Sequence, residues 1–257
     1  MRIVMARRTP TVLLITVLIV AVPLARGKTS HASGTTQAEI QVALCSEPDQ
    51  VIRALDLASR GGVRDTWLFD DAALTLFDRG LRIRLRATET GSELTLKAAI
   101  DDCAHVPRAL IPAKAGKCEH DVHGDSVTAA VSLTSRLKAP VVDALVSDRL
   151  PIAEVLSPAQ ASYLREAAKL WPLPSDLRPL GPIKVSTYRA REKPYDVDVS
   201  RLPTGERYVE VSRKVALGDV DAARKGFDDD LARSGVTICV DQSAQAVNKL
   251  RALLRAP

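Results

Sequence analysis

Two short catalytic signatures are missing from this sequence of 257 residues. No G-x-S-x-G nucleophile elbow is present, which excludes the α/β-hydrolase type of serine catalysis. Ser126, Ser132 and Ser135 lie near histidines only in sequence. No G-x-x-x-x-G-K-[ST] loop is present either, which excludes a P-loop nucleotide site. The chain also lacks internal repeats and low-complexity segments, and its length suits one large domain or two small ones.

An excess of charge is missing as well, once the N-terminus is set apart. The full chain has a formal net charge of +5, with 36 Lys and Arg against 31 Asp and Glu. The first 32 residues hold five of the basic residues and no acidic one, so 31 basic residues balance 31 acidic residues in the rest. A neutral chain gives no support to nucleic-acid binding.

The N-terminus, residues 1–32, is typical of an export signal. A basic start precedes the apolar run Val12–Ala25, which is shorter than the roughly 20 residues of a membrane span. Ser30 and Ala32 then offer small side chains at two positions before a possible cleavage point. We expect a signal peptide, with an uncleaved N-terminal anchor as the alternative, and a linker at 33–38. The protein is therefore expected to be periplasmic, secreted or envelope-anchored, and to contact a membrane only through an uncleaved leader.

All four cysteines lie in the expected exported part, where an oxidising compartment favours two disulfides. Three connectivities are open, and we prefer Cys103 with Cys118 across one loop and Cys45 with Cys239 between the two ends of the chain. The alternative is a zinc site, which would use Cys103, Cys118, His105, His120 and His123. Its one-residue gaps are tight for tetrahedral ligation, so the disulfides are favoured.

Apolar and cationic residues alternate strictly between residues 81 and 86, which read LRIRLR. The period of two predicts a strand that places Arg82, Arg84 and Arg86 on one face. A second strand, 93–97, follows after a short turn. Three guanidinium groups in a row repel one another unless anions lie nearby. The row is therefore either the wall of an anion-binding site or a solvated face with acids opposite.

Strand and helix patterns follow one another along the rest of the chain. We expect helices at 46–60, 139–170, 220–234 and 243–255. We expect strands at 38–44, 63–70, 79–87, 93–100, 126–133, 183–191, 195–201, 207–215 and 236–240. Residues 101–125 contain several Pro and Gly and are expected to form a loop.

The order of these elements resembles the CYTH family, also called triphosphate tunnel metalloenzymes. The motifs that carry the resemblance are Asp65-Thr66, Leu81-Arg82-Ile83-Arg84 and Leu94-Thr95-Leu96-Lys97. It implies an α+β fold in a single domain spanning 39–257, namely an eight-stranded antiparallel β-barrel with flanking helices. A helical insertion is expected at about 139–180. The interior of such a barrel is charged, which is unfavourable unless the charges neutralise one another or a ligand.

The resemblance also implies the residues of a site. The phosphate-binding positions would be Arg82, Arg84, Lys97, Arg189, Arg191 and Lys214. The metal ligands would be Glu39, Asp198 and Glu210, holding Mg²⁺ or Mn²⁺, with Glu39 and Glu210 as the catalytic pair. The implied activity is metal-dependent hydrolysis of inorganic triphosphate or a related triphosphate outside the cytoplasm. The implied partner is a triphosphate or polyphosphate, bound by a monomer.

The acidic part of the family pattern is incomplete in this chain. Gln41 and Ala43 stand where the first strand would carry a carboxylate and a Lys, and Ser212 stands where a second late acid often lies. These losses weaken a two-metal site most, while a single metal stays open. A tunnel that binds polyphosphate or another polyanion without cleaving it also stays open, as does a structural envelope protein that binds no anion. Cyclase activity is disfavoured because an exported protein lacks ATP.

Overall fold

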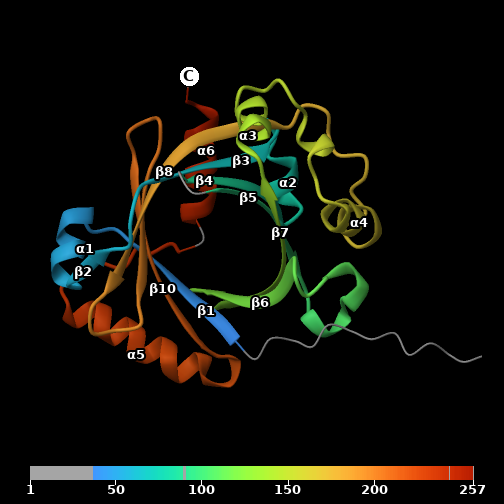
Figure 1. The fold of residues 1–257 in the computed structure, drawn as a ribbon. Coiled ribbons are helices and arrows are strands. Elements are labelled where there is room, and N and C mark those ends of the chain that lie inside the picture. Colours follow the sequence, from blue (N-terminus) through green and yellow to red (C-terminus); the bar gives the residue numbers. More distant parts are fainter. Residues whose placement is uncertain (1–36, 89–90, 243, 257) are drawn as a thin grey trace, which may run out of the picture.

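A computed structural model describes residues 37–88, 91–242 and 244–256, so the predicted leader and most of the predicted linker lie outside the described residues. Nine strands close into a barrel, in the order β8-β3-β4-β5-β7-β6-β1-β10-β9 and back to β8 (Figure 1). The barrel strands are β1 Gln37–Leu44, β3 Arg64–Asp70, β4 Leu81–Thr88, β5 Gly91–Ile100, β6 Gly116–His123, β7 Ser126–Leu137, β8 Arg178–Ala190, β9 Asp196–Arg201 and β10 Arg207–Ala216. A short strand, β2 Leu57–Ser59, pairs with β8 outside this ring.

Helices lie outside the barrel wall and at one of its ends. The α-helices are α1 Pro48–Ala54, α2 Thr75–Asp78, α3 Ala139–Val146, α4 Pro158–Glu166, α5 Val220–Arg233 and α6 Ala244–Leu254. The 3₁₀ turns are η1 Cys103–His105, η2 Arg108–Leu110, η3 Ile152–Glu154 and η4 Leu217–Asp219. Among the described residues, no helix is long and apolar enough to span a membrane.

The predicted α+β barrel is confirmed, and it differs from the expectation in strand number and in one pairing. It has nine strands in place of eight, and β1 pairs with β6 in parallel while the other described pairings are antiparallel. The extra strand is β6, in a segment expected to be a loop because Gly116 and Gly124 flank it. Pairing with β7 along the whole length of β6 outweighs these turn signals.

Three other elements depart from the pattern-based expectation. The helix expected over 46–60 ends at Ala54, and residues 57–59 form β2, which pairs with β8. The helix expected over 139–170 is the pair α3 and α4, because Pro151 and Pro158 cannot donate the hydrogen bonds of a continuous helix. The strand expected at 236–240 is reduced to a single bridge between Leu44 and Ile238.

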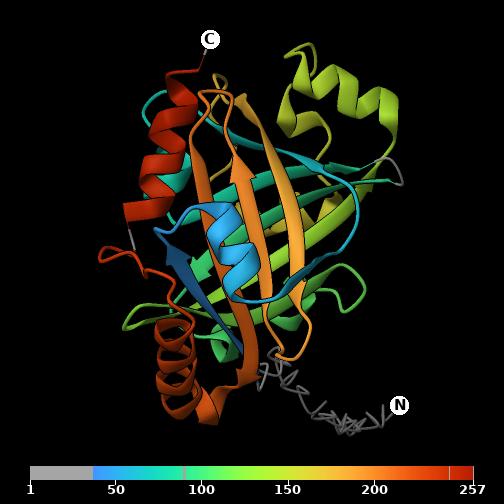
Figure 2. The ribbon, with the colours of Figure 1, turned by 90° about the vertical axis from the view of Figure 1, so that its left-hand side faces the viewer.

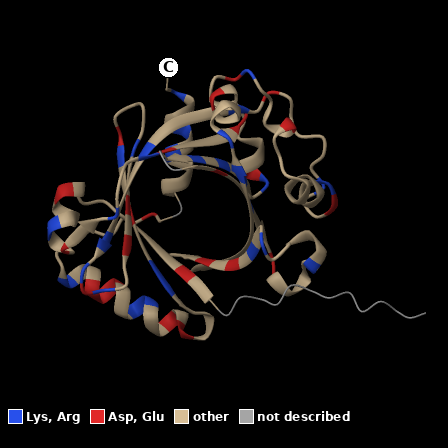
Figure 3. Ribbon diagram, in the orientation of Figure 1, with Lys and Arg blue, Asp and Glu red and all other residues tan. Residues whose placement is uncertain are grey.

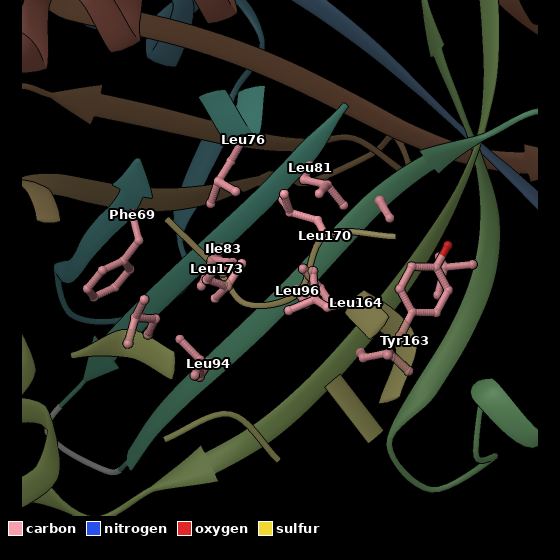
Figure 4. Packing of buried hydrophobic residues seen from close by; sticks show 14 of the residues in the cluster. Phe69, Leu76, Leu81, Ile83, Leu94, Leu96, Tyr163, Leu164, Leu170 and Leu173 are labelled. Carbon is pink, nitrogen blue, oxygen red and sulfur yellow. The ribbon is translucent and has the colours of Figure 1, made fainter. Parts of the chain in front are cut away.

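The apolar residues of β4 and β5 face outward into the largest core. Leu81, Ile83 and Leu85 are at most 4% exposed and pack with the apolar residues of β5. Helices α2, α3 and α4 cover this outer face and add Leu76, Tyr163 and Leu164 to the cluster (Figures 1 and 4). Since side chains alternate along a strand, the arginines of β4 must point into the barrel.

A second core lies on the opposite outer wall. Helices α1 and α5 cover the outward faces of β1, β9 and β10, where Val42, Val197 and Val211 pack with Phe227 of α5 (Figure 1). A third, smaller cluster closes one end of the barrel. Helix α6 lies at that end (Figures 1 and 2). Its Leu250 and Leu253 belong to a cluster with Leu68, Ile183 and Val185. The end of the barrel away from α6 has no such apolar cluster among the described residues.

Both preferred disulfides are formed, Cys45 with Cys239 and Cys103 with Cys118. The zinc alternative therefore loses its two cysteine ligands. The bridge at Cys45 joins the end of β1 to the segment that leads into α6, and Gln242 reinforces it by hydrogen bonding both backbone groups of Ala43. The two ends of the domain are tied together beside the capped end of the barrel.

Candidate anion-binding site

Charged residues occur on strands all around the barrel (Figure 3). In the register of β4 with β5, Arg82 lies opposite Lys97 and Arg84 lies opposite Thr95. Residues that lie opposite one another in paired strands share a face, so Arg82, Arg84 and Lys97 converge on the interior. The solvated-face alternative for the β4 arginines is not supported by this arrangement.

Arg84 is the most buried cation of the row. Burial, together with the charges of Arg86, Arg64 and Arg82, lowers the pKa of its guanidinium to about 9. Its Nε atom is buried without a hydrogen-bond partner. Burial and the charge of Arg64 lower the pKa of Arg86 as well. A cationic group in these surroundings is destabilised unless an anion joins it.

The β4 row forms no ion pair with a described carboxylate, although Arg86 lies opposite Glu93 of β5 in the register. Among the described carboxylates, none forms an ion pair with Arg82, Arg84 or Arg86. Arg82 instead lies over the ring of Phe77, with 5.5 Å between its Cζ atom and the ring centroid. The guanidinium groups of this wall could therefore pair with an anionic ligand.

Arg64 on β3 is a further inward cation, and the sequence analysis missed it. Its Nη2 atom lies 3.1 Å from Oδ2 of Asp198, and the other carboxylate oxygen of Asp198 accepts a hydrogen bond of 2.7 Å from Thr187. Asp198, one of the predicted metal ligands, thus serves as a counter-ion in this structure. The signal for Arg64 was its position two residues before Thr66, which places both on one face of the strand.

Strand β6 contributes an acidic wall that was also missed. Its inward residues are Lys117, Glu119, Asp121 and His123. Lys97 of β5 reaches across β7 to this wall, with its Nζ atom 2.5 Å from Oδ2 of Asp121 and 3.7 Å from Oε1 of Glu119. Lys117 lies 2.6 Å from the other Glu119 oxygen. The alternation of charged residues at every second position was the available signal.

The register of β1 explains where the incomplete acidic pattern falls. Gln41 lies directly opposite Ser212 of β10, so the two lost carboxylates belong to one place in the barrel. Glu39 lies opposite Lys214, and Glu210 lies opposite Ala43. Glu39 and Glu210 are therefore four residues apart along this strand pair, or about 14 Å at 3.4 Å per residue.

On its other side β1 meets the acidic wall of β6. Glu39 lies opposite Asp121 and Gln41 lies opposite His123. Burial lowers the pKa of His123, against the raising influence of Glu210 and Asp121. The carboxylate nearest in register to Glu39 is therefore on β6, not on β10.

Two of the predicted cations lie at the rim. Arg189 shares the inner face with Asp196 but is half exposed, and it pairs with Asp196 at 3.4 Å. Arg191 follows the end of β8 and pairs with Asp56 at 3.3 Å, with 63% of its side chain exposed. Among the predicted positions, Arg82, Arg84, Lys97, Lys214, Glu39 and Glu210 face the interior, and Arg191 does not join them.

The donors on β1 and β6 suit a divalent cation only in part. In the described segments, no three His, Cys, Asp or Glu side chains gather closely enough to bind a metal alone. Asp121 is only 7% exposed, and its Oδ1 atom is buried without a hydrogen-bond partner. A free carboxylate oxygen of this kind fits Mg²⁺ or Mn²⁺, which commonly take one or two protein carboxylates and complete their shell with phosphate oxygens and water.

Comparison with known proteins places the fold. No protein-family description matches this chain, and no curated protein matches it in sequence. A solved structure of the candidate adenylyl cyclase HpAC1 from Hippeastrum, described as having a dominant triphosphatase activity, is similar with a TM-score of 0.51 and 16% identity, over 84% of this chain and 97% of that chain. A candidate adenylate cyclase from Bacillus halodurans is similar with a TM-score of 0.50 and 16% identity, over 82% of this chain and 98% of that chain. These likenesses support the fold that the resemblance to the CYTH family implies.

Proposed function

We propose that the protein binds inorganic triphosphate, or a small molecule with a triphosphate group, inside the barrel and hydrolyses it with a divalent cation. The observation that carries this proposal is the inward row of Arg82, Arg84 and Arg86, which lacks ion-pair partners among the described carboxylates. Guanidinium groups form pairs of parallel hydrogen bonds with phosphate oxygens, and the anion would relieve the mutual repulsion of the row.

In hydrolysis, the side chains of the protein would position the phosphates and stabilise the charge on the phosphate oxygens. Lys97 and Lys214 are proposed to bind phosphate beside the arginines, and Glu39 and Glu210 remain the proposed catalytic acids. Of the predicted metal ligands, Asp198 is the least suited, because Arg64 and Thr187 already hold its oxygens. When bound, Mg²⁺ or Mn²⁺ would polarise a terminal phosphate oxygen. Side chains on a closed barrel are fixed before the ligand arrives, which favours such positioning.

A second candidate function is binding of polyphosphate or another polyanion without cleavage. It is favoured by the neutral pair Gln41 and Ser212, which face each other where the family resemblance implies carboxylates. The arginine row serves either function equally well.

We also propose that the protein acts outside the cytoplasm. The two disulfides support an oxidising compartment, and the leader pattern of residues 1–32 supports export.

The decisive experiment measures binding of tripolyphosphate by calorimetry and release of phosphate with Mg²⁺ or Mn²⁺. The double variant Arg82→Ala plus Arg84→Ala is expected to lose at least about 100-fold in affinity, since hydrogen bonds to charged groups contribute about 1.5–3 kcal/mol each. The matched control is Lys184→Ala plus Arg201→Ala, which removes two cations that lie opposite each other on the outer face. Binding without turnover by the wild-type protein would select the second candidate, and absence of binding would reject both.

A further inference from the structure

We propose that Glu119 and Asp121 of β6 form the cation-binding wall of this barrel, and that a divalent cation binds there only together with a triphosphate. This inference rests on the proposed binding of triphosphate and adds where the cation is held. It assigns to β6 the acidic role that β1 and β10 have lost at Gln41 and Ser212.

Without a ligand, Lys97 is held by the carboxylates of the β6 wall. Its ammonium group is 2.5 Å from Oδ2 of Asp121 and 3.7 Å from Oε1 of Glu119, so the acidic wall holds the lysine that lies in register with Arg82. A triphosphate that binds the β4 row competes with these two carboxylates for the same ammonium group.

That competition would leave the Asp121 and Glu119 carboxylates without Lys97 as their partner. The side chain of Asp121 is 10% exposed and that of Glu119 is 15% exposed, so both carboxylates are poorly hydrated. A buried charge that loses its partner is strongly unfavourable. The approaching phosphates add repulsion, because they carry the same sign. Triphosphate binding alone would therefore be opposed by the β6 wall.

A divalent cation would remove both unfavourable terms, namely the burial of unpaired carboxylates and their repulsion of the phosphates. It can bind the two carboxylates and bridge them to phosphate oxygens, which is the usual way in which Mg²⁺ is held beside phosphates. Asp121 already offers an unpartnered Oδ1 atom, and Glu39 lies opposite Asp121 in the parallel register. The two β6 carboxylates are an incomplete metal site alone, and the triphosphate completes it.

The basic groups around the wall are consistent with this exchange. Burial by itself would raise the pKa of Glu119, but the hydrogen bond from Lys117 and the charges of Lys97 and Lys214 lower it. Lys117 is 54% exposed and can turn to water when a cation arrives.

The test measures binding of Mn²⁺ by electron paramagnetic resonance, with and without imidotriphosphate as a non-hydrolysed probe. The wild-type protein is expected to bind Mn²⁺ at least about tenfold more tightly when the probe is present, within the usual range of coupling between sites. Asp121→Asn is expected to abolish this coupling. In chelator, the same variant should bind the probe as tightly as the wild-type protein or more tightly, because it no longer competes for Lys97.

Matched variants make the outcomes distinct. Asp65→Asn, which changes an outer-face carboxylate paired with Lys184, should behave as wild type. Glu119→Gln tests the same wall if Asp121→Asn does not fold. Coupling that survives both β6 changes and disappears in Glu39→Gln or Glu210→Gln would overturn the inference. Probe binding without any coupled Mn²⁺ would overturn it while leaving triphosphate binding intact, and a wild-type protein that binds no probe would overturn both proposals.

Discussion

The β4 wall and the β6 wall both face the interior of the barrel, but they differ in whether their buried charges form ion pairs. The β4 wall holds Arg82, Arg84 and Arg86 with no ion pair to a described carboxylate. The β6 wall holds Glu119 and Asp121 with lysines at 2.5–3.7 Å. One wall is electrostatically incomplete and the other is self-neutralised.

This difference separates the ligand-binding part of the site from the part that responds to the ligand. An unpaired cationic row reduces the stability of the folded protein and gains stability when an anion binds. A paired acidic wall contributes to stability until the anion takes its lysine. Substitutions on the two walls should therefore change stability and affinity in different proportions.

The largest effect is expected from Lys97→Met, which removes the cation from two poorly hydrated carboxylates. Breaking a buried ion pair from one side usually costs about 3–5 kcal/mol. Because 23% of the Lys97 side chain is exposed, we expect the lower end, about 3 kcal/mol, in the free energy of unfolding measured with urea.

Lys117→Met is the matched control on the same wall. Lys117 pairs with Glu119 but is 54% exposed, so its removal should cost less than about 1 kcal/mol. Adding Asp121→Asn to Lys97→Met should recover part of the lost stability. If the two lysine variants were equally stable, the β6 wall would be solvated and its contrast with β4 would disappear.

A smaller effect is expected from Arg84→Met, which should lower the affinity for the anion without lowering the stability of the folded protein. Removing this crowded cation should leave the free energy of unfolding unchanged or raise it by up to about 1 kcal/mol, because the repulsion and the burial of charge are both relieved. The affinity for tripolyphosphate should fall at least about tenfold, which corresponds to about 1.4 kcal/mol. Calorimetry and urea unfolding on the same samples measure both quantities.

Arg207→Met is the control, since this exposed arginine pairs with Glu47 on the outside of the barrel. It should change neither quantity by more than about 0.5 kcal/mol. A clear loss of stability in Arg84→Met would mean that Arg84 is satisfied in the folded protein, and the β4 wall would then resemble the β6 wall.

The contrast between the walls also shows which parts of the site can be predicted from sequence patterns. The strict alternation at residues 81–86 encodes both the strand and the face of its arginines, because side-chain direction follows from the period of two. The strand and the direction of its arginines therefore depend on neighbouring residues alone. From the sequence, the disulfide pairs are a preference among three open connectivities, and Cys45 and Cys239 are 194 residues apart.

The β6 wall depends instead on long-range pairing. Glu119 and Asp121 carry the same alternation, but the flanking glycines suggest a loop, and only pairing with β1 and β7 makes the segment a strand. The roles of Asp198 and Glu39 likewise depend on which strands meet, since Arg64 reaches Asp198 across β8 and Asp121 meets Glu39 in a parallel pair. Register between distant strands is not encoded in any local pattern.

The smallest effect is expected at His123, whose protonation would add a positive charge to the β6 wall. Burial lowers its pKa from the ordinary 6.5, so the folded protein binds fewer protons there than the unfolded chain does just below pH 6.5. Stability should therefore rise with pH through that window and fall on acidification. His123→Asn should remove this part of the acid loss and leave the stability at alkaline pH unchanged, as measured by urea unfolding across a pH series. Parallel profiles for the two proteins would mean that His123 titrates as in water, and that the β6 wall gains a positive charge whenever the pH falls.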